Sequence, residues 1–597
     1  MYLRYFAWQF VGKEDHDNPN WELITLKGDI IKKLRGINWS RYGLPFPLLF
    51  GVIGMIFHFS RDWKRALAVL SLFLATGIMI ILYLNQYDPQ PRERDYSYVG
   101  SFFTFSIWIG MGVAAFQEKI KDWLEGVEIA GFVSIGLTGI IFAVMPFTIL
   151  ATDFKEHNRN GNYVAWDYAY NMLNSCEPNG IIFTNGDNDT FPLWYIQEVE
   201  GVRTDVRVVN LSLLNTPWYI EQLKNEEPRL PLNLKDENIK KLDPVFGTVY
   251  ALRKWTSIWP ELKAQYNQYT QAQYGTSYSV SNFGILHKWG PVDARIGKGE
   301  NQINWQIRPK LSNYLRVQDI MILQIIEDAI KTRPVYFAVT VAPNNRMGID
   351  NYLEMEGLVY RVTFEESAER THMPRLNYDR MIQNISETDD YNSLIYHPEE
   401  YWNHINAGHG MYRYTNLDNP DVYFNENIRR LIQNYRSSFL QLGLQNLYSS
   451  DEDGKVKTLN ILDKMENYFP QDVIPTTDAE LDIQIGRIYK QAGQPEELKN
   501  RLKSVQKRKD ISLETQMYIG QIYMNEFQDY DAAIEHYEKL YDEYPYIPDF
   551  LYTLVQAYAK AERRSDAVEL LEIWLGSHPH DSQAVDWLSI LAPPPPQ

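Results

Sequence analysis

The sequence holds a single cysteine, Cys176, among 597 residues. One thiol excludes an internal disulfide framework and any cysteine-based zinc site. Positive charge is also scarce, because 58 Lys and Arg stand against 76 Asp and Glu, for a formal net charge of −18. This excess of negative charge repels phosphate backbones, so the composition argues against a nucleic-acid-binding function.

Several motifs that carry chemistry in other proteins are absent. The sequence has no glycine-rich phosphate loop and no nucleophile elbow. His157, His404 and His409 lack the helical spacing of metal ligands. The sequence therefore predicts no cofactor and no histidine metal site.

Long charge-free apolar runs, in contrast, crowd into the first quarter of the chain. They predict a bundle of about four transmembrane helices within residues 44–152, with spans at about 44–60, 66–85, 98–117 and 129–151. Each run approaches or exceeds the roughly 18–20 residues that a helix needs to cross a hydrocarbon core of ~30 Å. The first run is the weakest, because Pro45, Pro47 and His58 interrupt it.

The short loops between these runs indicate an orientation. Arg61, Lys64 and Arg65 follow the first run, and Lys119 and Lys121 follow the third. The positive-inside rule places both loops in the cytoplasm and the long acidic tail on the periplasmic or outer side of an inner membrane. The seven basic residues within 1–43 would then also lie outside, which conflicts with the same rule.

The N-terminal segment 1–43 begins MYLRYFAWQF. No apolar core of a signal peptide follows it. Aromatic residues beside Arg4 are typical of a segment at a membrane interface, and an ordinary amphipathic helix is the alternative. A start inside such sequence leads us to expect the rear part of a longer polytopic protein.

Residues 155–370 change to short strands that alternate with helices. Strands are predicted at 181–184, 206–211 and 334–342, and helices after Pro192, after Pro217 and over VQDIMILQIIEDAIKTR. This order predicts an outer α/β domain with a small parallel or mixed sheet covered by helices. Segment 226–310 has no regular spacing of apolar residues typical of a helix or a strand, and it is interpreted as an insertion.

The densest polar cluster follows the first of these strands, at residues 185–190. Ligands in open sheets bind outside the carboxyl ends of strands, where this turn would lie. We therefore consider Asn185, Asp187, Asn188 and Asp189 as a saccharide- or peptide-binding site. Two alternatives remain: a divalent cation held by Asp187 and Asp189, or a structural turn in which Asp189 or Thr190 caps a helix with Pro192 in its first turn.

A second cluster, PRERDY at residues 91–96, lies between two predicted spans. Arg92 and Arg94 could bind a lipid phosphate in bidentate fashion at the membrane surface. The alternative is a solvated loop in which these arginines pair with Glu93 and Asp95.

The last part of the chain is predicted to be helical, with a linker region at 371–470 and tetratricopeptide-like repeats at 478–590. Gly486 and Tyr489 recur 34 residues later as Gly520 and Tyr523. The same pattern accounts for three further kinds of position: Tyr558, the alanines Ala533 and Ala567, and the prolines Pro545 and Pro579. Such stacks bind peptides or partner domains, or act as a structural cap. Residues 591–597 are predicted to be a disordered tail.

The runs QYDPQPRERDYSYVGSFFTFSIWIG and GIIFTNGDNDTFPLWYIQEVEGVRTDVRVVNLSLLNTPWYIEQLK closely resemble a family of bacterial polytopic membrane proteins. The family is catalogued as a domain of unknown function and is related to protein O-mannosyltransferases. The resemblance covers most of residues 1–370, and tetratricopeptide-like C-termini also occur in the family. It implies a GT-C architecture, in which a helical bundle transfers a sugar from a polyprenyl-phosphate donor.

The chain departs from that family in having only four expected spans. It looks like the C-terminal portion, without the early outer loop in which GT-C enzymes usually carry the catalytic carboxylate, so no catalytic residue is assigned. The leading hypothesis is the C-terminal part of a GT-C-like glycosyltransferase with a protein or glycan acceptor. The alternative is a membrane-anchored assembly protein whose repeats recruit partners without catalysis.

Overall fold

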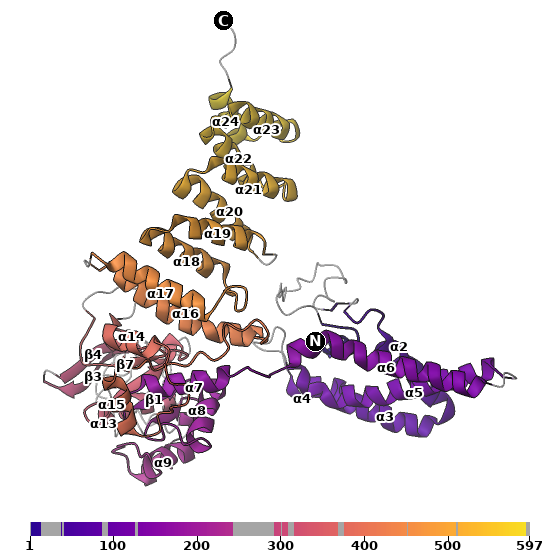
Figure 1. Ribbon diagram of the computed structural model, residues 1–597, viewed down its shortest axis with the longest axis horizontal. Helices are drawn as coiled ribbons and strands as arrows, with labels where there is room; N and C mark the ends of the chain where they lie inside the picture. Colours follow the sequence, from indigo (N-terminus) through magenta and orange to yellow (C-terminus); the bar gives the residue numbers. More distant parts are fainter. Residues whose placement is uncertain are drawn as a thin grey trace, which may run out of the picture. The chain divides into compact units, whose positions relative to one another are not determined.

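The structure is a computed structural model, and its N-terminal part is a set of apolar helices (Figure 1). It describes residues 2–13, 37–38, 41–85, 94–125, 129–240, 242, 292–299, 301–307, 316–367, 375–449, 452–508 and 511–592. The N-terminal helices are α1 (Tyr2–Phe10), α2 (Phe46–Arg61), α3 (Trp63–Thr76), α4 (Ile78–Leu84), the 3₁₀ turn η2 (Asp95–Tyr98), α5 (Val99–Trp123) and α6 (Ala130–His157).

Three helical stretches in the described part of the chain are long and apolar enough to cross a membrane: Trp63–Leu84, Asp95–Trp123 and Gly131–His157. The fourth expected span, 44–60, is the shorter helix α2 of 16 residues. Its length is about 24 Å at 1.5 Å per residue, less than a hydrocarbon core of ~30 Å. Pro45 precedes this helix and Asp62 follows it, which limits its length.

Glycines bring α2 and α5 unusually close together. A Cβ added to Gly54 would lie 1.8 Å from the Trp108 carbonyl oxygen, and one added to Gly112 would lie 1.9 Å from that of Phe50. Trp108 also donates its indole N–H to Nδ1 of His58, at 3.3 Å. Small residues allow this kind of backbone approach in membranes, where helix packing replaces the hydrophobic effect.

Contacts at the helix termini show which ends of the bundle coincide. Arg61 at the end of α2 pairs with Glu118 near the end of α5 at 2.6 Å, so these two helices run parallel. Arg41, just before α2, pairs with Asp153 near the end of α6 at 2.8 Å. The starts of α2 and α5 and the end of α6 therefore lie at one end, and the basic residues 61–65 lie at the other.

Helix α1 packs within this bundle. Its Tyr2 hydroxyl donates to Ser101 Oγ at 3.0 Å, and its Phe6 ring lies 4.8 Å from that of Phe105. Lys13 and Ile37 form an isolated antiparallel bridge. The aromatic N-terminus of the predicted interfacial segment thus forms a helix whose rings contact α3, η2 and α5, and residues 14–36 lie outside the described residues.

The middle of the chain forms a mixed six-stranded sheet with the order β2-β1-β5-β7-β6-β8. The edge strand β2 and its neighbours β1 and β5 are parallel, whereas β7 is antiparallel to both β5 and β6. The strands are β1 (Ile181–Thr184), β2 (Arg207–Asn210), β5 (Val335–Ala338), β6 (Leu353–Met355), β7 (Val359–Val362) and β8 (Arg375–Leu376). The predicted small parallel or mixed sheet is therefore confirmed.

Within the expected insertion 226–310 the structure describes the helix α10 and the hairpin β3-β4. Further helices, turns and the two strands of this hairpin accompany the sheet. They are α7 (Val164–Ser175), α8 (Asp187–Glu198), η3 (Leu213–Asn215), α9 (Pro217–Asn225), α10 (Asp236–Ile239), β3 (Val292–Lys298), β4 (Asn301–Ile307), α13 (Val317–Ala329), η5 (Pro343–Asn345), η6 (Asp350–Tyr352), α14 (Tyr378–Ile385), α15 (Pro398–Asn406), α16 (Glu426–Leu447) and α17 (Gly454–Tyr468).

A fully buried guanidinium connects the end of α7 to the segment that precedes β2. Arg203 has no exposed surface, and its Nη1 and Nη2 donate to the carbonyl oxygens of Leu173 and Cys176, both at 3.0 Å. Its Nε pairs with Asp205 at 2.9 Å. The charge thus satisfies carbonyl groups that the end of a helix leaves without partners.

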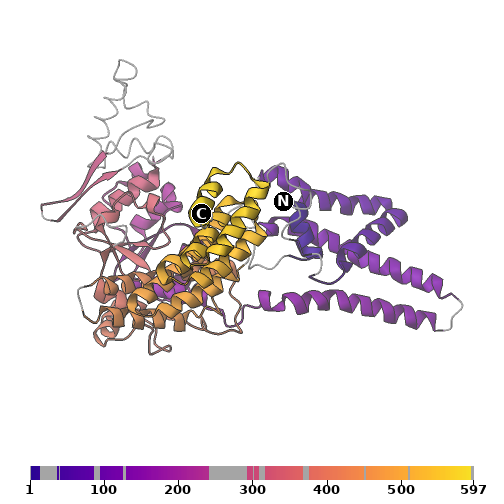
Figure 2. The ribbon, with the colours of Figure 1, turned by 90° about the horizontal axis from the view of Figure 1, so that it is seen from above.

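The C-terminal helices stack as antiparallel pairs (Figure 2). They are α18 (Ala479–Ala492), α19 (Pro495–Gln506), α20 (Leu513–Ile522), the π-helical turn η7 (Tyr523–Phe527), α21 (Tyr530–Glu543), α22 (Pro548–Lys560), α23 (Arg564–Ser577) and α24 (Ser582–Leu591). Ala533 and Ala567 are fully buried, and a Cβ added to Gly520 would lie 2.2 Å from the Tyr537 ring. Small residues therefore occupy the contacts between paired helices, as the repeat pattern predicts.

The close approach of α2 and α5 can be tested with two Gly→Ala substitutions whose expected effects on the free energy of unfolding have opposite signs. We expect Gly54→Ala to lower the free energy of unfolding by roughly 1–3 kcal/mol, because the added methyl group would overlap the Trp108 carbonyl. The matched control is Gly110→Ala on α5, where an added Cβ meets nothing within 4 Å. Alanine should stabilise that helix by roughly 0.5–1 kcal/mol. Thermal unfolding in detergent measures both, and equal melting temperatures for the two variants would contradict the packing described.

Candidate functional site

Residues 185–190 comprise the turn after β1 and the first residues of α8, and the carboxylate of Asp189 holds them together. Its Oδ2 accepts the N–H of Asn185 at 2.8 Å, and its Oδ1 accepts the N–H of Gly186 at 2.9 Å. Thr340, which follows β5, donates its hydroxyl to Oδ2 at 2.6 Å. Asp189, in the first turn of α8, thus accepts the N–H of the N-cap residue Gly186, and it also links the segments that follow two neighbouring strands.

A buried hydroxyl cluster lies beneath this turn. Thr190 Oγ1 lies 2.7 Å from Thr184 Oγ1, and it accepts the side-chain amide of Asn210 at 3.0 Å. All three side chains are fully buried. The backbone N–H of Asn210 donates to the hydroxyl of Tyr219 at 3.0 Å, and burial raises the pKa of Tyr219 to about 12. These bonds fix the carboxyl ends of β1 and β2 together.

Asn185 connects the turn to a second polar chain. Its Oδ1 accepts the amide of Asn345 at 3.0 Å, and Asn345 in turn accepts Arg316 Nη2 at 2.8 Å. Arg316 is held by Asp319 at 2.9 Å. Neither Arg316 nor Asn345 was singled out from the sequence. The signal that could have found Asn345 is its place in the segment that follows β5, because β5 is the parallel neighbour of β1.

The other two predicted residues, Asp187 and Asn188, are exposed on the first turn of α8. Both oxygens of Asp189 are already engaged with N–H and hydroxyl donors, which leaves Asp187 as the single free carboxylate of the pair. Across the described ranges, no three His, Cys, Asp or Glu residues are grouped so that they could hold a metal ion. The first turn of α8 therefore presents the Asp187 carboxylate and the Asn188 amide to solvent.

The helix begins earlier than expected from the sequence. Pro192 was predicted in the first turn, but α8 starts at Asp187 and places Pro192 at its sixth position. The prediction was wrong because Gly186 is the N-cap, with an extended φ of −165°. The Asp189 carboxylate satisfies the N–H groups ahead of the helix, so the helix can begin before the proline.

The second predicted cluster is described only in part, because Arg92 lies outside the described residues. Arg94 is exposed at the start of η2, and its backbone N–H donates to the hydroxyl of Tyr5 at 3.4 Å. Asp95 accepts Gln9 at 3.4 Å. Arg94 and the turn at 185–190 belong to separate compact units.

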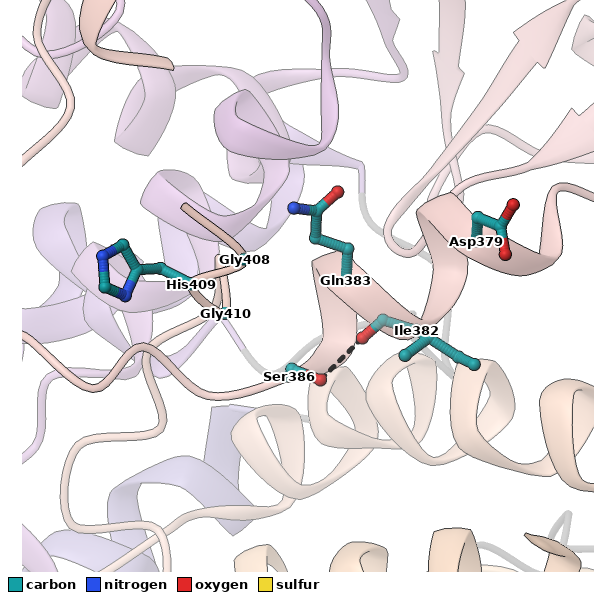
Figure 3. A pocket seen from close by; sticks show the side chains of 7 residues that line it. All are labelled: Asp379, Ile382, Gln383, Ser386, Gly408, His409 and Gly410. Carbon is teal, nitrogen blue, oxygen red and sulfur yellow. Dashed lines mark hydrogen bonds between the residues drawn. The ribbon is translucent and has the colours of Figure 1, made fainter. Parts of the chain in front are cut away.

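Two cavities of the α/β unit are weaker candidates than this turn, because many of their polar side chains are bonded to other groups of the protein. The smaller, of about 290 Å³, lies beside α14 (Figure 3). Its Gln383 donates to the Ile405 carbonyl at 3.1 Å and its Ser386 to the Ile382 carbonyl at 2.7 Å. His409 lowers the pKa of Asp389 through a hydrogen bond. The side chains of Gln383, Ser386 and His409 are therefore engaged with the protein itself.

The larger cavity, of about 690 Å³, lies before β5, at the amino end of the parallel strands. Arg361 on its wall binds both oxygens of Glu177 at 2.8 and 3.1 Å, and Arg375 pairs with Glu354 at 3.1 Å. Both arginines form ion pairs with glutamates of the protein itself. The carboxyl edge of the sheet, where Asp187 and Asn188 face solvent, remains the strongest candidate site.

Comparison with known proteins bears on two parts of the chain. Residues 165–276 and 289–380, which include the turn, match the family described as TMEM260-associated domain 2. Residues 525–586 match the family described as tetratricopeptide repeat, so the predicted repeats are confirmed there. A comparison with curated proteins found no match. The expected relation to bacterial membrane proteins and protein O-mannosyltransferases stays a prediction.

The roles of the two aspartates can be separated by mutation. We expect Asp189→Ala to destabilise the first turn of α8 by roughly 0.5–2 kcal/mol, because two N–H groups lose their acceptor. Asp187→Ala is the matched control and should change stability by less than about 0.5 kcal/mol. Hydrogen exchange of the α8 amides in the full chain measures both. Protection that rises with millimolar Mg²⁺ or Mn²⁺, and that Asp187→Ala abolishes, would contradict this assignment and favour a metal site.

Proposed function

We propose that this chain is part of a GT-C-like membrane glycosyltransferase that moves a sugar from a polyprenyl-phosphate donor to a protein or glycan acceptor. The apolar helices would contribute to the donor side, with Arg94 and Arg92 at the lipid phosphate. The carboxyl edge of the sheet, with Asn185, Asp187, Asn188 and Asp189, would form the acceptor side. In this role Asp189 and Asn185 shape the turn, and Asp187 and Asn188 contact the acceptor.

The observation that supports this proposal most directly is the arrangement of the helix ends. The start of α5, which Arg94 precedes by the turn η2, lies at the same end of the bundle as the end of α6. Helix α6 leads into the α/β domain through residues 158–163. A donor held at Arg94 and the point where the acceptor-binding domain begins would thus share one membrane face. The family resemblance of the NGDNDTFPLWY stretch adds to this support.

A second function is favoured by the tetratricopeptide match. Repeats of this kind generally mediate protein–protein interactions, so the chain would be a membrane-anchored assembly protein that recruits partners without catalysis. This alternative predicts neither donor binding nor sugar transfer. The measurement of donor binding below therefore distinguishes the two proposals.

If Arg94 binds the donor phosphate, Arg94→Ala should weaken the binding of polyprenyl phosphate by roughly 1.5–3 kcal/mol, as expected for a charge-assisted hydrogen bond. The matched control is Arg65→Ala, an exposed arginine at the opposite end of the bundle. Binding to the full chain in detergent is measured by displacement of a fluorescent polyprenyl phosphate. Equal affinities for both variants and the unmodified chain would remove Arg94 from the donor site, and the absence of any binding would favour the assembly protein.

The proposal also requires that the acidic domains lie on the outer side of the membrane. A reporter enzyme that is active only outside the cytoplasm should be active when it is fused after Gln597, because the basic residues 61–65 and 119–121 would remain inside. The same reporter inserted after Lys64 should be inactive. Activity after Lys64 and none after Gln597 would reverse the orientation.

A further inference from the structure

Aromatic side chains form a connected row on α8 and α9, beside the turn at 185–190. The rings of Phe191 and Trp194 are stacked with centroids 5.6 Å apart. Trp194 lies 6.4 Å from Tyr219, and Tyr219 lies 5.6 Å from Trp218. Although Tyr219 is buried, Phe191 is 49 % exposed and Trp218 is 56 % exposed. Large rings at this level of exposure present apolar faces directly to solvent.

The same face of α8 carries polar groups within reach of these rings. Asp187, Phe191 and Tyr195 follow one another at intervals of four residues, so they share one side of the helix. All three are exposed, as is Asn188. The cap is made by Asp189, so the Asp187 carboxylate and the Asn188 amide are available for a ligand.

The charge of this surface restricts what can bind there. No Lys or Arg occurs between Arg159 and Arg203, whereas Asp187, Glu198 and Glu200 are exposed on or just after α8. Arg316, which is connected to the turn through Asn345, is paired with Asp319, so the exposed carboxylates of α8 repel anionic lipid headgroups and phosphate groups. A complementary ligand would have no negative charge. It would stack one face on the aromatic rings and form hydrogen bonds at its edge with Asp187 and Asn188.

We propose that the aromatic row and the exposed Asp187 and Asn188 form a binding site for an uncharged saccharide. A sugar ring offers C–H groups on a flat face, which would pack on Phe191 and Trp218. Its hydroxyl groups would donate to Asp187 and exchange hydrogen bonds with the Asn188 amide. This inference rests on the proposed function and narrows its acceptor to a glycan or a glycan-bearing protein.

The test measures saccharide binding without any donor lipid. The full chain is placed in nanodiscs of neutral phosphatidylcholine, because glycoside detergents would compete. Mannotriose, cellotriose and chitotriose are titrated while tryptophan fluorescence and saturation-transfer NMR are recorded. At least one sugar should bind, and Phe191→Ala and Trp218→Ala should each raise its Kd by about tenfold, which corresponds to about 1.4 kcal/mol.

Two further variants separate stacking from folding and from simple exposure. Phe191→Leu keeps an apolar side chain but removes the ring, so it should also weaken binding. Trp402→Ala removes an exposed tryptophan of α15, outside the row, and should leave the Kd unchanged. Circular dichroism verifies that each variant is folded.

The outcomes distinguish this inference from the function on which it rests. Failure of all three sugars to bind at about 10 mM would overturn the saccharide site, as would equal affinities for Phe191→Leu, Trp402→Ala and the unmodified chain. A lysine-rich peptide that binds in place of every sugar and is lost with Phe191→Ala would also overturn it. Saccharide binding without donor binding or sugar transfer would uphold the site and reject the glycosyltransferase.

Discussion

The carboxylate of Asp189 is the interaction on which the candidate site depends. One side chain binds two backbone N–H groups of the turn and the hydroxyl of Thr340, so it fixes the end of β1, the start of α8 and the segment after β5. Hydrogen bonds to a charged acceptor are stronger than neutral ones, so these three bonds fix the turn firmly. The rest of the edge follows from this arrangement: Asp187 and Asn188 are turned outward, and Phe191 is placed one helical turn beyond them.

A fully buried charge, that of Arg203, performs a comparable task elsewhere in the α/β domain. Arg203 is held by Asp205 and by carbonyl groups at the end of α7, and its guanidinium lies 4.7 Å from the centre of the Tyr401 ring in α15. A buried ion of this kind tolerates little change, because any partner that is removed leaves a charge without compensation. The α/β domain is therefore specified by a few ionic contacts as well as by its apolar core.

Local patterns predicted the elements well, since each depends on a short stretch of sequence. The apolar strand 181–184, the helix within VQDIMILQIIEDAIKTR and the Gly520–Tyr523 repeat pattern all correspond to elements of the structure. The partners of the turn could not be predicted in this way, because Thr340 and Asn345 lie more than 150 residues away from it. The position of Pro192 was misjudged for a related reason: proline at the start of a helix is a statistical preference, whereas the cap here is set by Asp189. The aromatic row was missed because its rings come from two helices that the sequence does not place side by side.

The short, glycine-lined helix α2 has a consequence for biogenesis. Its polypeptide is about 24 Å long, and its Gly54 face is complementary to a helix that the ribosome delivers some fifty residues later. Helix α2 is shorter than a hydrocarbon core of ~30 Å. Until α5 is synthesised, it also lacks the helix that packs against its glycine face. The contact between the glycine face of α2 and α5 can therefore form only after the later helix has been synthesised.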